Sequence, residues 1–362
     1  MMKLPNRIPL RLAPRLFQVP APVRLIHSTT TRTANVDPLV GTGPPPEAPT
    51  TSGYQRVERR RRQAELLKAA RDIRSGKSKS TALKKRFWDD VHVKEVDGAL
   101  QVHLDERPLR HPLTKEIVRL PVTKGYLAAA LALEWDNLTS VQEATKQHLI
   151  PLTSLVCRAI DIRTDDASDS PEASKIRTAI ATTVMKYLDT DSLLCWAPPA
   201  GPFDLKNDAG ESLRDVQKKT ADSIVSFLTT NTWPGIKIEP VLDGHSIVPQ
   251  QQSEGVREVI HGWVMGLDAW EITALERAVL AGKSFLAAAR LVVEWSEGAA
   301  RASDLATVGT FGADEAAKAT NLEVDWQAGQ WGEVEDTHDV NNEDVRRQLG
   351  SAVLLVSGDG KY

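Results

Sequence analysis

Three charged residues near the carboxy-terminal end of the chain have a spacing that could hold a metal ion. Glu335, His338 and Asp339 lie at i, i+3 and i+4, so on a helix they would project from one face. Helical-bundle di-metal proteins use the Glu-x-x-His spacing twice, with further carboxylates, and this sequence has no second copy. The spacing therefore favours a hydrogen-bonded cluster or a protein-binding surface over a metal site.

A second group of carboxylates stands in the string Leu188-Asp189-Thr190-Asp191. Two carboxylates this close could serve acid/base or metal chemistry. Asp and Thr are also common turn and cap residues, and the string follows a stretch with helical periodicity. We therefore expect Asp189 and Asp191 to form a turn. A metal-dependent hydrolase that combines them with Glu335 and His338 is the enzymatic alternative.

The string Gly282-Lys283-Ser284 resembles the end of a phosphate-binding loop, G-x-x-x-x-G-K-[ST]. The first glycine would have to stand at position 277, which is Arg277, and residues 275–280 have a helical pattern where a strand is required. We predict instead a helix that ends at Gly282 and a new helix from Ser284. No nucleophile elbow, zinc-protease motif or dinucleotide fingerprint is present either, so we predict no enzymatic activity and no cofactor.

The amino-terminal segment is basic and contains no acidic residue before Asp37. An Arg-rich, Ser-containing and acid-free segment is typical of a mitochondrial transit peptide, and a disordered basic tail is the alternative. Arg24, Ile26 and Thr29 are spaced like a two-step processing site. We therefore predict a transit peptide over residues 1–33, a mature chain that begins near Ala34, and a location in the mitochondrial matrix.

The composition excludes several classes of protein. Hydrophobic residues make up 41% and charged residues 26% of the 362 residues, as in soluble globular proteins. No run reaches the roughly 18 apolar residues that a membrane-spanning helix needs. Loss of six of the 45 basic residues with the transit peptide leaves 39 against 48 acidic residues, a net charge of −9. We therefore expect neither membrane insertion nor a nucleic-acid partner.

A Pro-rich linker and a basic segment fill residues 34–85. The basic run 56–86 ends in Phe87-Trp88, and cationic and aromatic side chains together can bind single-stranded nucleic acid. On an acidic protein a solvated linker helix is the simpler interpretation. An RNA-binding protein that uses this run is the third functional alternative. Cys157 and Cys195 are the only cysteines, too few for a disulfide framework, and we expect both to be buried.

The remaining pattern predicts an α+β fold, a small antiparallel β-rich domain (86–122) followed by a larger all-α helical domain (123–362). Asp97-Gly98 between alternating apolar residues predicts a hairpin, and 117–120 could add a strand. Helical periodicity begins after Pro121. The expected helix features are a cap at Thr123, a buried stripe of Leu127, Leu131 and Trp135, a start at Ser170-Pro171, and helices over 285–295 and 314–325.

Several strings, in order over residues 86–350, resemble the mitochondrial and α-proteobacterial family of F₁-ATPase assembly chaperones that act on the α subunit. They are Arg86-Phe87-Trp88, Val102 to Leu109, Glu134-Trp135-Asp136, Pro151 to Leu155, Leu188 to Asp191, and Trp331-Gly332 with Glu335 and His338-Asp339. The resemblance implies a non-enzymatic, two-domain chaperone, which we expect to be monomeric. It would hold the unassembled α subunit, prevent its aggregation and release it to the β subunit.

The resemblance also divides the candidate residues into two groups. Those of the carboxy-terminal signature are the candidates for partner binding: Trp331, Glu335, His338 and Asp339. The others form the structural signature: Glu134, Trp135, Asp136, Pro151, Asp189 and Asp191.

Amino-terminal processing can be tested on protein purified from the organelle. Because the acid-free basic segment ends near Ala34, amino-terminal sequencing should give a first residue close to that position. An intact Met1 on the organelle-purified protein would contradict the targeting prediction.

Overall fold

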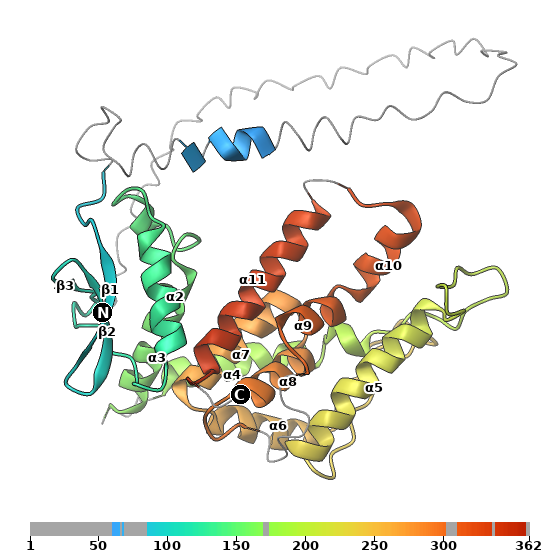
Figure 1. The fold of residues 1–362 in the computed structure, drawn as a ribbon. Helices are drawn as coiled ribbons and strands as arrows, with labels where there is room; N and C mark the ends of the chain where they lie inside the picture. Colours follow the sequence, from blue (N-terminus) through green and yellow to red (C-terminus); the bar gives the residue numbers. More distant parts are fainter. Residues whose placement is uncertain are drawn as a thin grey trace, which may run out of the picture. The chain divides into compact units, whose positions relative to one another are not determined.

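The fold is taken from a computed structural model, which describes residues 60–65, 67–68, 85–168, 174–301, 310–334 and 337–359. The elements from residue 85 onward are β1 (Val91–Val96), β2 (Ala99–Leu104), β3 (Arg107–Pro108), α2 (Gly125–Asp136), the 3₁₀ helix η2 (Glu143–Thr145), α3 (Pro151–Asp166), α4 (Lys175–Leu188), the 3₁₀ helix η3 (Ser192–Leu194), α5 (Leu213–Asn231), α6 (Glu254–Gly266), α7 (Ala269–Gly282), α8 (Phe285–Trp295), α9 (Ala313–Thr320), α10 (Leu322–Trp331) and α11 (His338–Val356). A small antiparallel sheet followed by helices confirms the predicted α+β class (Figure 1). The domain boundary at 122–123 stays a prediction.

The sheet begins with the predicted hairpin. Asp97 and Gly98 have φ of 53° and 70°, the left-handed conformation that a two-residue turn with the twist of the strands requires. The hairpin pairs β1 with β2 from Val91 opposite Leu104 to Val96 opposite Ala99. The expected strand over 117–120 was wrong, because that segment contacts its neighbours only through isolated bridges, Leu100 to Leu120 and Arg110 to Ile117.

Helix α2 packs against β1 and β2 and carries the predicted buried stripe (Figure 1). Leu127 and Leu131 are fully buried and Trp135 is 9% exposed. The cap predicted at Thr123 was wrong. Lys124 precedes the helix, and the Asp359 carboxylate accepts a hydrogen bond from the Tyr126 N–H at 2.9 Å. The first turn of α2 is thus satisfied from the far end of the chain.

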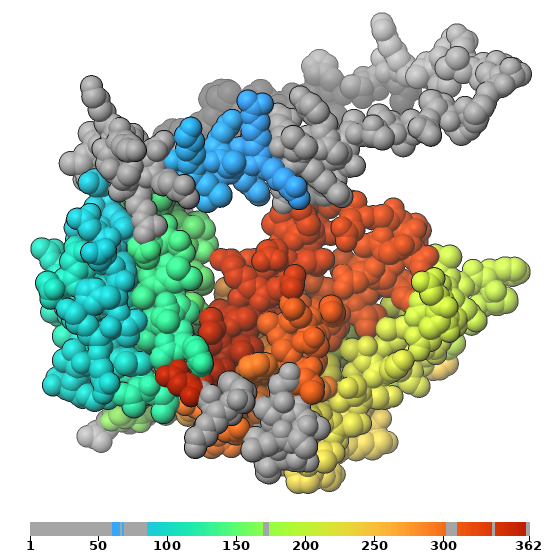
Figure 2. Space-filling model, in the orientation of Figure 1, coloured from blue at the N-terminus to red at the C-terminus, as the bar shows by residue number. Residues whose placement is uncertain are grey.

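Helix α7 lies at the centre of the helical part, because it packs against α3, α4, α8 and α11. The buried side chains of the sheet and of the helices form one continuous core, from Trp88 to Val356. In the space-filling view the strands lie beside α2, and α2 borders the end of α11 (Figure 2). Among the described residues, no helix is long and apolar enough to cross a membrane.

Some helix boundaries differ from the expectation. Helix α8 matches the predicted 285–295. The expected helix over 314–325 is two helices, α9 and α10, which are separated at Asn321. Helix α4 begins at Lys175, and the predicted start at Ser170-Pro171 lies outside the described residues.

Substitution of Trp135 should measure how much the packing at the end of α2 stabilises the fold. Trp135→Ala removes a buried ring and its hydrogen bond, so the free energy of unfolding should fall by about 3 to 5 kcal/mol. Trp135→Phe keeps most of the ring and should cost less, about 1 to 2 kcal/mol. Chemical unfolding of both variants, with the exposed Tyr126→Ala as control, measures this. A fully stable Trp135→Ala protein would show that the ring is not structural.

Candidate functional site

Glu134 and Trp135 hold the start of α3 against the end of α2. The Glu134 carboxylate accepts hydrogen bonds from the backbone N–H groups of Leu152 at 2.8 Å and Thr153 at 2.9 Å, and from the Thr153 hydroxyl at 2.7 Å. Trp135 Nε1 donates to the same Thr153 hydroxyl at 2.8 Å. Burial raises the pKa of Glu134, against the effect of these bonds. Pro151 is well placed at the first position of α3, where its missing N–H leaves no donor unsatisfied.

Arg86 and Asp136 extend this cluster to the segment before β1. The buried Arg86 guanidinium donates to the Asp136 carbonyl at 2.9 Å and to its carboxylate at 3.3 Å. It also lies over the Trp88 ring, whose centroid is 5.6 Å from that of Trp135. The strings Arg86-Phe87-Trp88 and Glu134-Trp135-Asp136 therefore meet in the core, where they join the start of the β-rich region to α2 and α3. Their geometry is that of a structural cluster.

Asp189 and Asp191 do not face a common site. Asp189 pairs with Arg257 of α6. Asp191 is fully buried and accepts hydrogen bonds from the N–H groups of Leu193 at 3.0 Å and Leu286 at 2.8 Å, so it caps both η3 and the start of α8. Burial raises its pKa to about 6, although the hydrogen bonds act in the opposite direction. The predicted turn is confirmed, and the structure does not bring the two carboxylates together as a catalytic pair.

The turn Gly282-Lys283-Ser284 joins α7 to α8 as predicted. Lys283 has a φ of 53° and ends α7 in the left-handed conformation. The Ser284 hydroxyl accepts a hydrogen bond from the Ala287 N–H at 3.1 Å, the geometry of a helix cap. These residues are therefore used to end one helix and start the next.

The carboxy-terminal signature lies where α10 ends and α11 begins. Trp331, the last residue of α10, is 76% exposed, and Val334 is 58% exposed. The ring of His338 accepts a hydrogen bond from the Val334 N–H at 3.2 Å through Nδ1. Asp339 lies in the first turn of α11, and Glu335 lies outside the described residues. Helix α11 begins at His338, so His338 and Asp339 lie in its first turn, and the shared face with Glu335 stays a prediction.

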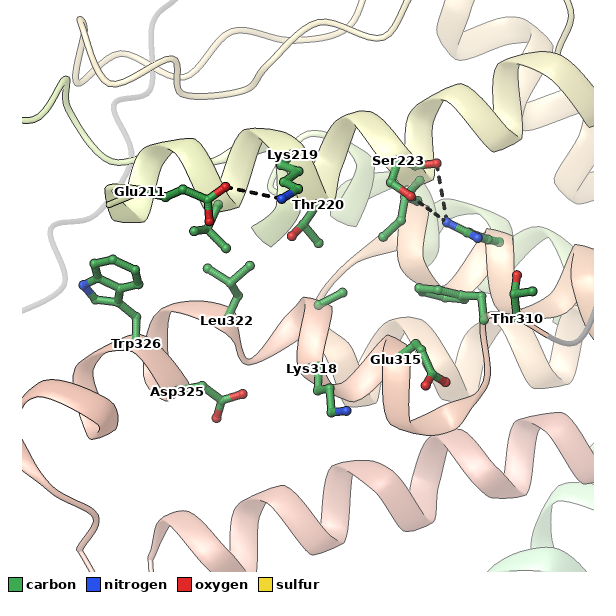
Figure 3. Close-up of a pocket in the computed structure, with 15 residues that line it drawn as sticks. Glu211, Lys219, Thr220, Ser223, Thr310, Glu315, Lys318, Leu322, Asp325 and Trp326 are labelled. Carbon is green, nitrogen blue, oxygen red and sulfur yellow. Dashed lines mark hydrogen bonds and ion pairs between the residues drawn. The ribbon is translucent and has the colours of Figure 1, made fainter. Parts of the chain in front are cut away.

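A groove next to this segment runs between α5 and the pair α9 and α10 (Figure 3). Its volume is about 780 Å³, and its apolar lining consists of Val216, Ile224, Phe311, Ala319, Leu322 and Trp326. Leu322 and Trp326 point from α10 toward α5, and α10 has no fully buried side chain. An open apolar groove of this kind is a surface suited to a protein partner, and α10, which lines one side of it, ends at the exposed Trp331.

Charged side chains surround the apolar part of the groove. Lys219 pairs with Glu211 at 3.3 Å on the α5 side, and Lys318 and Asp325 lie on the opposite side. Burial and the nearby charge of Glu333 raise the pKa of Asp325, whereas the charge of His338 lowers it. His338 of the signature is thus electrostatically linked to the edge of the groove.

Little in the sequence indicates this groove. Its two sides come from residues 211–224 and 310–326, and each side has an ordinary amphipathic pattern by itself. Only the carboxy-terminal signature pointed to this part of the chain.

The two other functional alternatives gain no support from the described residues. In that part of the chain, no three His, Cys, Asp or Glu side chains converge as a metal site would require. Most of the basic run 56–86 lies outside the described residues. Cys157 is buried as expected, and burial raises the pKa of its thiol to about 12, but Cys195 is only half-buried, contrary to the expectation.

The family model and the curated relatives that match this chain indicate the same family. Residues 85–229 match the family model described as ATP12 chaperone protein. The chain is 31% identical over 281 residues to the mitochondrial protein atp12 of Schizosaccharomyces pombe, a match that covers 75% of this chain and 81% of that protein. It is 32% identical to the mitochondrial protein ATP12 of Saccharomyces cerevisiae, with 74% and 82% covered.

Two solved structures have the same fold. Atp12 from Paracoccus denitrificans is 24% identical, with a TM-score of 0.52 over 75% of this chain and 97% of that one. A protein from Agrobacterium tumefaciens is 23% identical, with a TM-score of 0.53 over 80% of this chain and 96% of that one.

Burial of Asp191 predicts a pH dependence of stability. Its folded pKa of about 6 lies above the ordinary value of about 3.9, so the folded state binds this proton more tightly. The resulting stabilisation is complete below roughly pH 4 and lost as the pH rises to about 6, a change of about 2 to 3 kcal/mol. The difference in unfolding free energy between wild type and Asp191→Asn should therefore shrink over this range and stay constant above it.

The exposed Asp208→Asn variant is the control, because it changes a carboxylate without changing the core. Urea unfolding at several pH values measures all three proteins. A difference between wild type and Asp191→Asn that does not vary with pH would contradict the assigned burial effect.

Proposed function

The chain belongs to the ATP12 chaperone family, and we propose that it binds the unassembled α subunit of F₁-ATPase in the mitochondrial matrix. It keeps the bound subunit from aggregating until the β subunit takes its place. Support for the matrix location comes from the basic amino-terminal segment and from the mitochondrial relatives.

The groove between α5 and α9–α10 is the observation that carries this proposal. Its apolar lining can bury apolar side chains of a partner, and the exposed Trp331 and Val334, at and after the end of α10, add further apolar surface. In this proposal the chaperone covers the surface of the α subunit that the β subunit later occupies. The groove of the chaperone substitutes for the β subunit.

Binding alone can perform this task, without catalysis. A chaperone that has a higher affinity for the unassembled subunit than for the assembled one selects the former, and no bound nucleotide is needed. Release follows when the β subunit competes for the same surface. Consistent with such a role, Asp189, Asp191, Lys283 and Ser284 are all engaged in holding helix ends.

We propose Trp331, Glu335, His338 and Asp339 as further contact residues for the partner. Trp331 supplies apolar area, and Glu335 with Asp339 supplies negative charge for basic residues of the α subunit.

Substitution of Trp331 should separate binding from stability. Because Trp331 is 76% exposed, Trp331→Ala should leave the melting temperature unchanged. It should raise the Kd for purified α subunit at least about tenfold, as the loss of an aromatic interface residue does. Glu335→Lys should weaken binding by a similar or larger factor. Suppression of α-subunit aggregation, followed by light scattering, and the Kd measure both effects.

Tyr126→Ala and Glu95→Lys are the matched controls, since they change an exposed aromatic residue on α2 and an exposed acid on β1. Normal binding by folded Trp331→Ala and Glu335→Lys proteins would exclude this surface. No binding of the α subunit by wild type would overturn the proposed function.

A further inference from the structure

A second cavity lies away from the groove, where the end of α2 and the start of α3 meet α7 and α11. Its volume is about 440 Å³, and we call it the Arg277 cavity. Leu152 and Leu354 contribute apolar surface, and Arg277, Arg347 and Glu134 contribute the charged groups. Glu134 and Pro151 of the structural signature hold the start of α3 and so stabilise one wall of the cavity. That role does not explain why arginine side chains line the cavity.

Arg277 is the unusual member. Its Nε atom is buried and has no hydrogen-bond acceptor among the described residues. Burial lowers the pKa of Arg277, the nearby charge of Arg347 lowers it further, and the negative charge of Asp344 acts in the opposite direction. A buried cationic donor without an acceptor costs folding free energy, so its presence at the edge of a cavity indicates a group that arrives from outside.

The carboxylates near Arg277 form hydrogen bonds with other groups. Both oxygens of Glu134 already accept hydrogen bonds from the start of α3 and from Thr153. Arg347 donates to Asp344 at 2.7 Å and to the His148 carbonyl at 3.3 Å, which engages only part of its five-donor guanidinium. Asp344, whose charge acts on Arg277, accepts hydrogen bonds from Arg347 and Gln348, so the cavity keeps free guanidinium donors.

We propose that the Arg277 cavity binds an acidic side chain, a Glu or Asp of the bound client polypeptide. The carboxylate would accept charge-assisted hydrogen bonds from Arg277, and its methylene groups would contact Leu152 and Leu354. A monovalent carboxylate fits better than a phosphate dianion, because the Glu134 carboxylate in the wall repels the second negative charge more strongly. This inference deepens the proposed function and rests on it, since it adds a charged contact to the apolar groove.

The test compares variants of the full chain in binding to purified α subunit. Arg277→Met keeps the aliphatic stem and removes the charge, so it should raise the Kd about tenfold or more, whereas Arg277→Lys should give an intermediate Kd. Arg346→Met is the matched control, because Arg346 is the neighbour of Arg347 on α11 but pairs with Asp314 at 2.7 Å outside the cavity. It should bind normally. No variant should unfold below the wild-type temperature, and Arg277→Met should unfold at the same temperature or higher, because it removes a buried donor that has no acceptor.

A second measurement does not require the α subunit. The ¹⁵N-labelled Nε–H resonance of Arg277 is titrated with N-acetyl-glutamate amide, with N-acetyl-glutamine amide and with inorganic phosphate. The glutamate compound should shift the resonance and slow its exchange with solvent, and the glutamine compound should not. A stronger response to phosphate would overturn the assignment to an acidic side chain.

The outcomes distinguish the two proposals. Unchanged binding of the α subunit by folded Arg277→Met, with normal binding by wild type, would overturn this inference and leave the proposed function intact. If wild type fails to bind the α subunit, the proposed function fails. The response of the Arg277 resonance then decides whether the cavity recognises a carboxylate. If the glutamate compound gives no response, carboxylate binding by the cavity is excluded too.

Discussion

The backbone N–H and C=O groups at a helix end need hydrogen-bond partners from other parts of the chain. The structure of this protein depends on charged side chains that form these hydrogen bonds. Glu134 satisfies the start of α3, Asp191 the start of α8, and Asp359 the start of α2. The buried Lys124 ammonium donates to the Leu355 carbonyl at 2.9 Å at the end of α11 and pairs with Glu297 at 2.8 Å. Each contact joins segments that are far apart in the sequence.

This constraint explains why conspicuous carboxylates are present without forming an active site. Glu134 and Asp191 are buried, their pKa values are raised by burial, and both are surrounded by donors from helix ends. Raised pKa values often mark catalytic acids, but here each carboxylate has its acceptor capacity used by backbone N–H groups. Among the described residues, the surfaces that remain available to a partner include the apolar groove and the Arg277 cavity.

Helix α11 is a physical connection between these two surfaces. Its first residue, His338, acts electrostatically on Asp325 at the edge of the groove, and its later residues Arg347 and Leu354 line the Arg277 cavity. The same helix packs against α7, α9, α8 and α3, so it is fixed in the core along its length. A client that reaches both surfaces would contact a rigid element, which lowers the entropic cost of ordering the interface.

The sequence by itself determined the features that depend on neighbouring residues. The hairpin at Asp97-Gly98, the buried stripe of α2 and the helix break at Gly282 follow from local backbone preferences and periodicity, and all three were predicted. Tertiary structure alone decided which carboxylate caps which helix, that Lys124 rather than Thr123 precedes α2, and that α5 faces α9 and α10 across a groove. Those features join residues separated by many positions along the chain, and the free energy of such contacts depends on packing that no local pattern encodes.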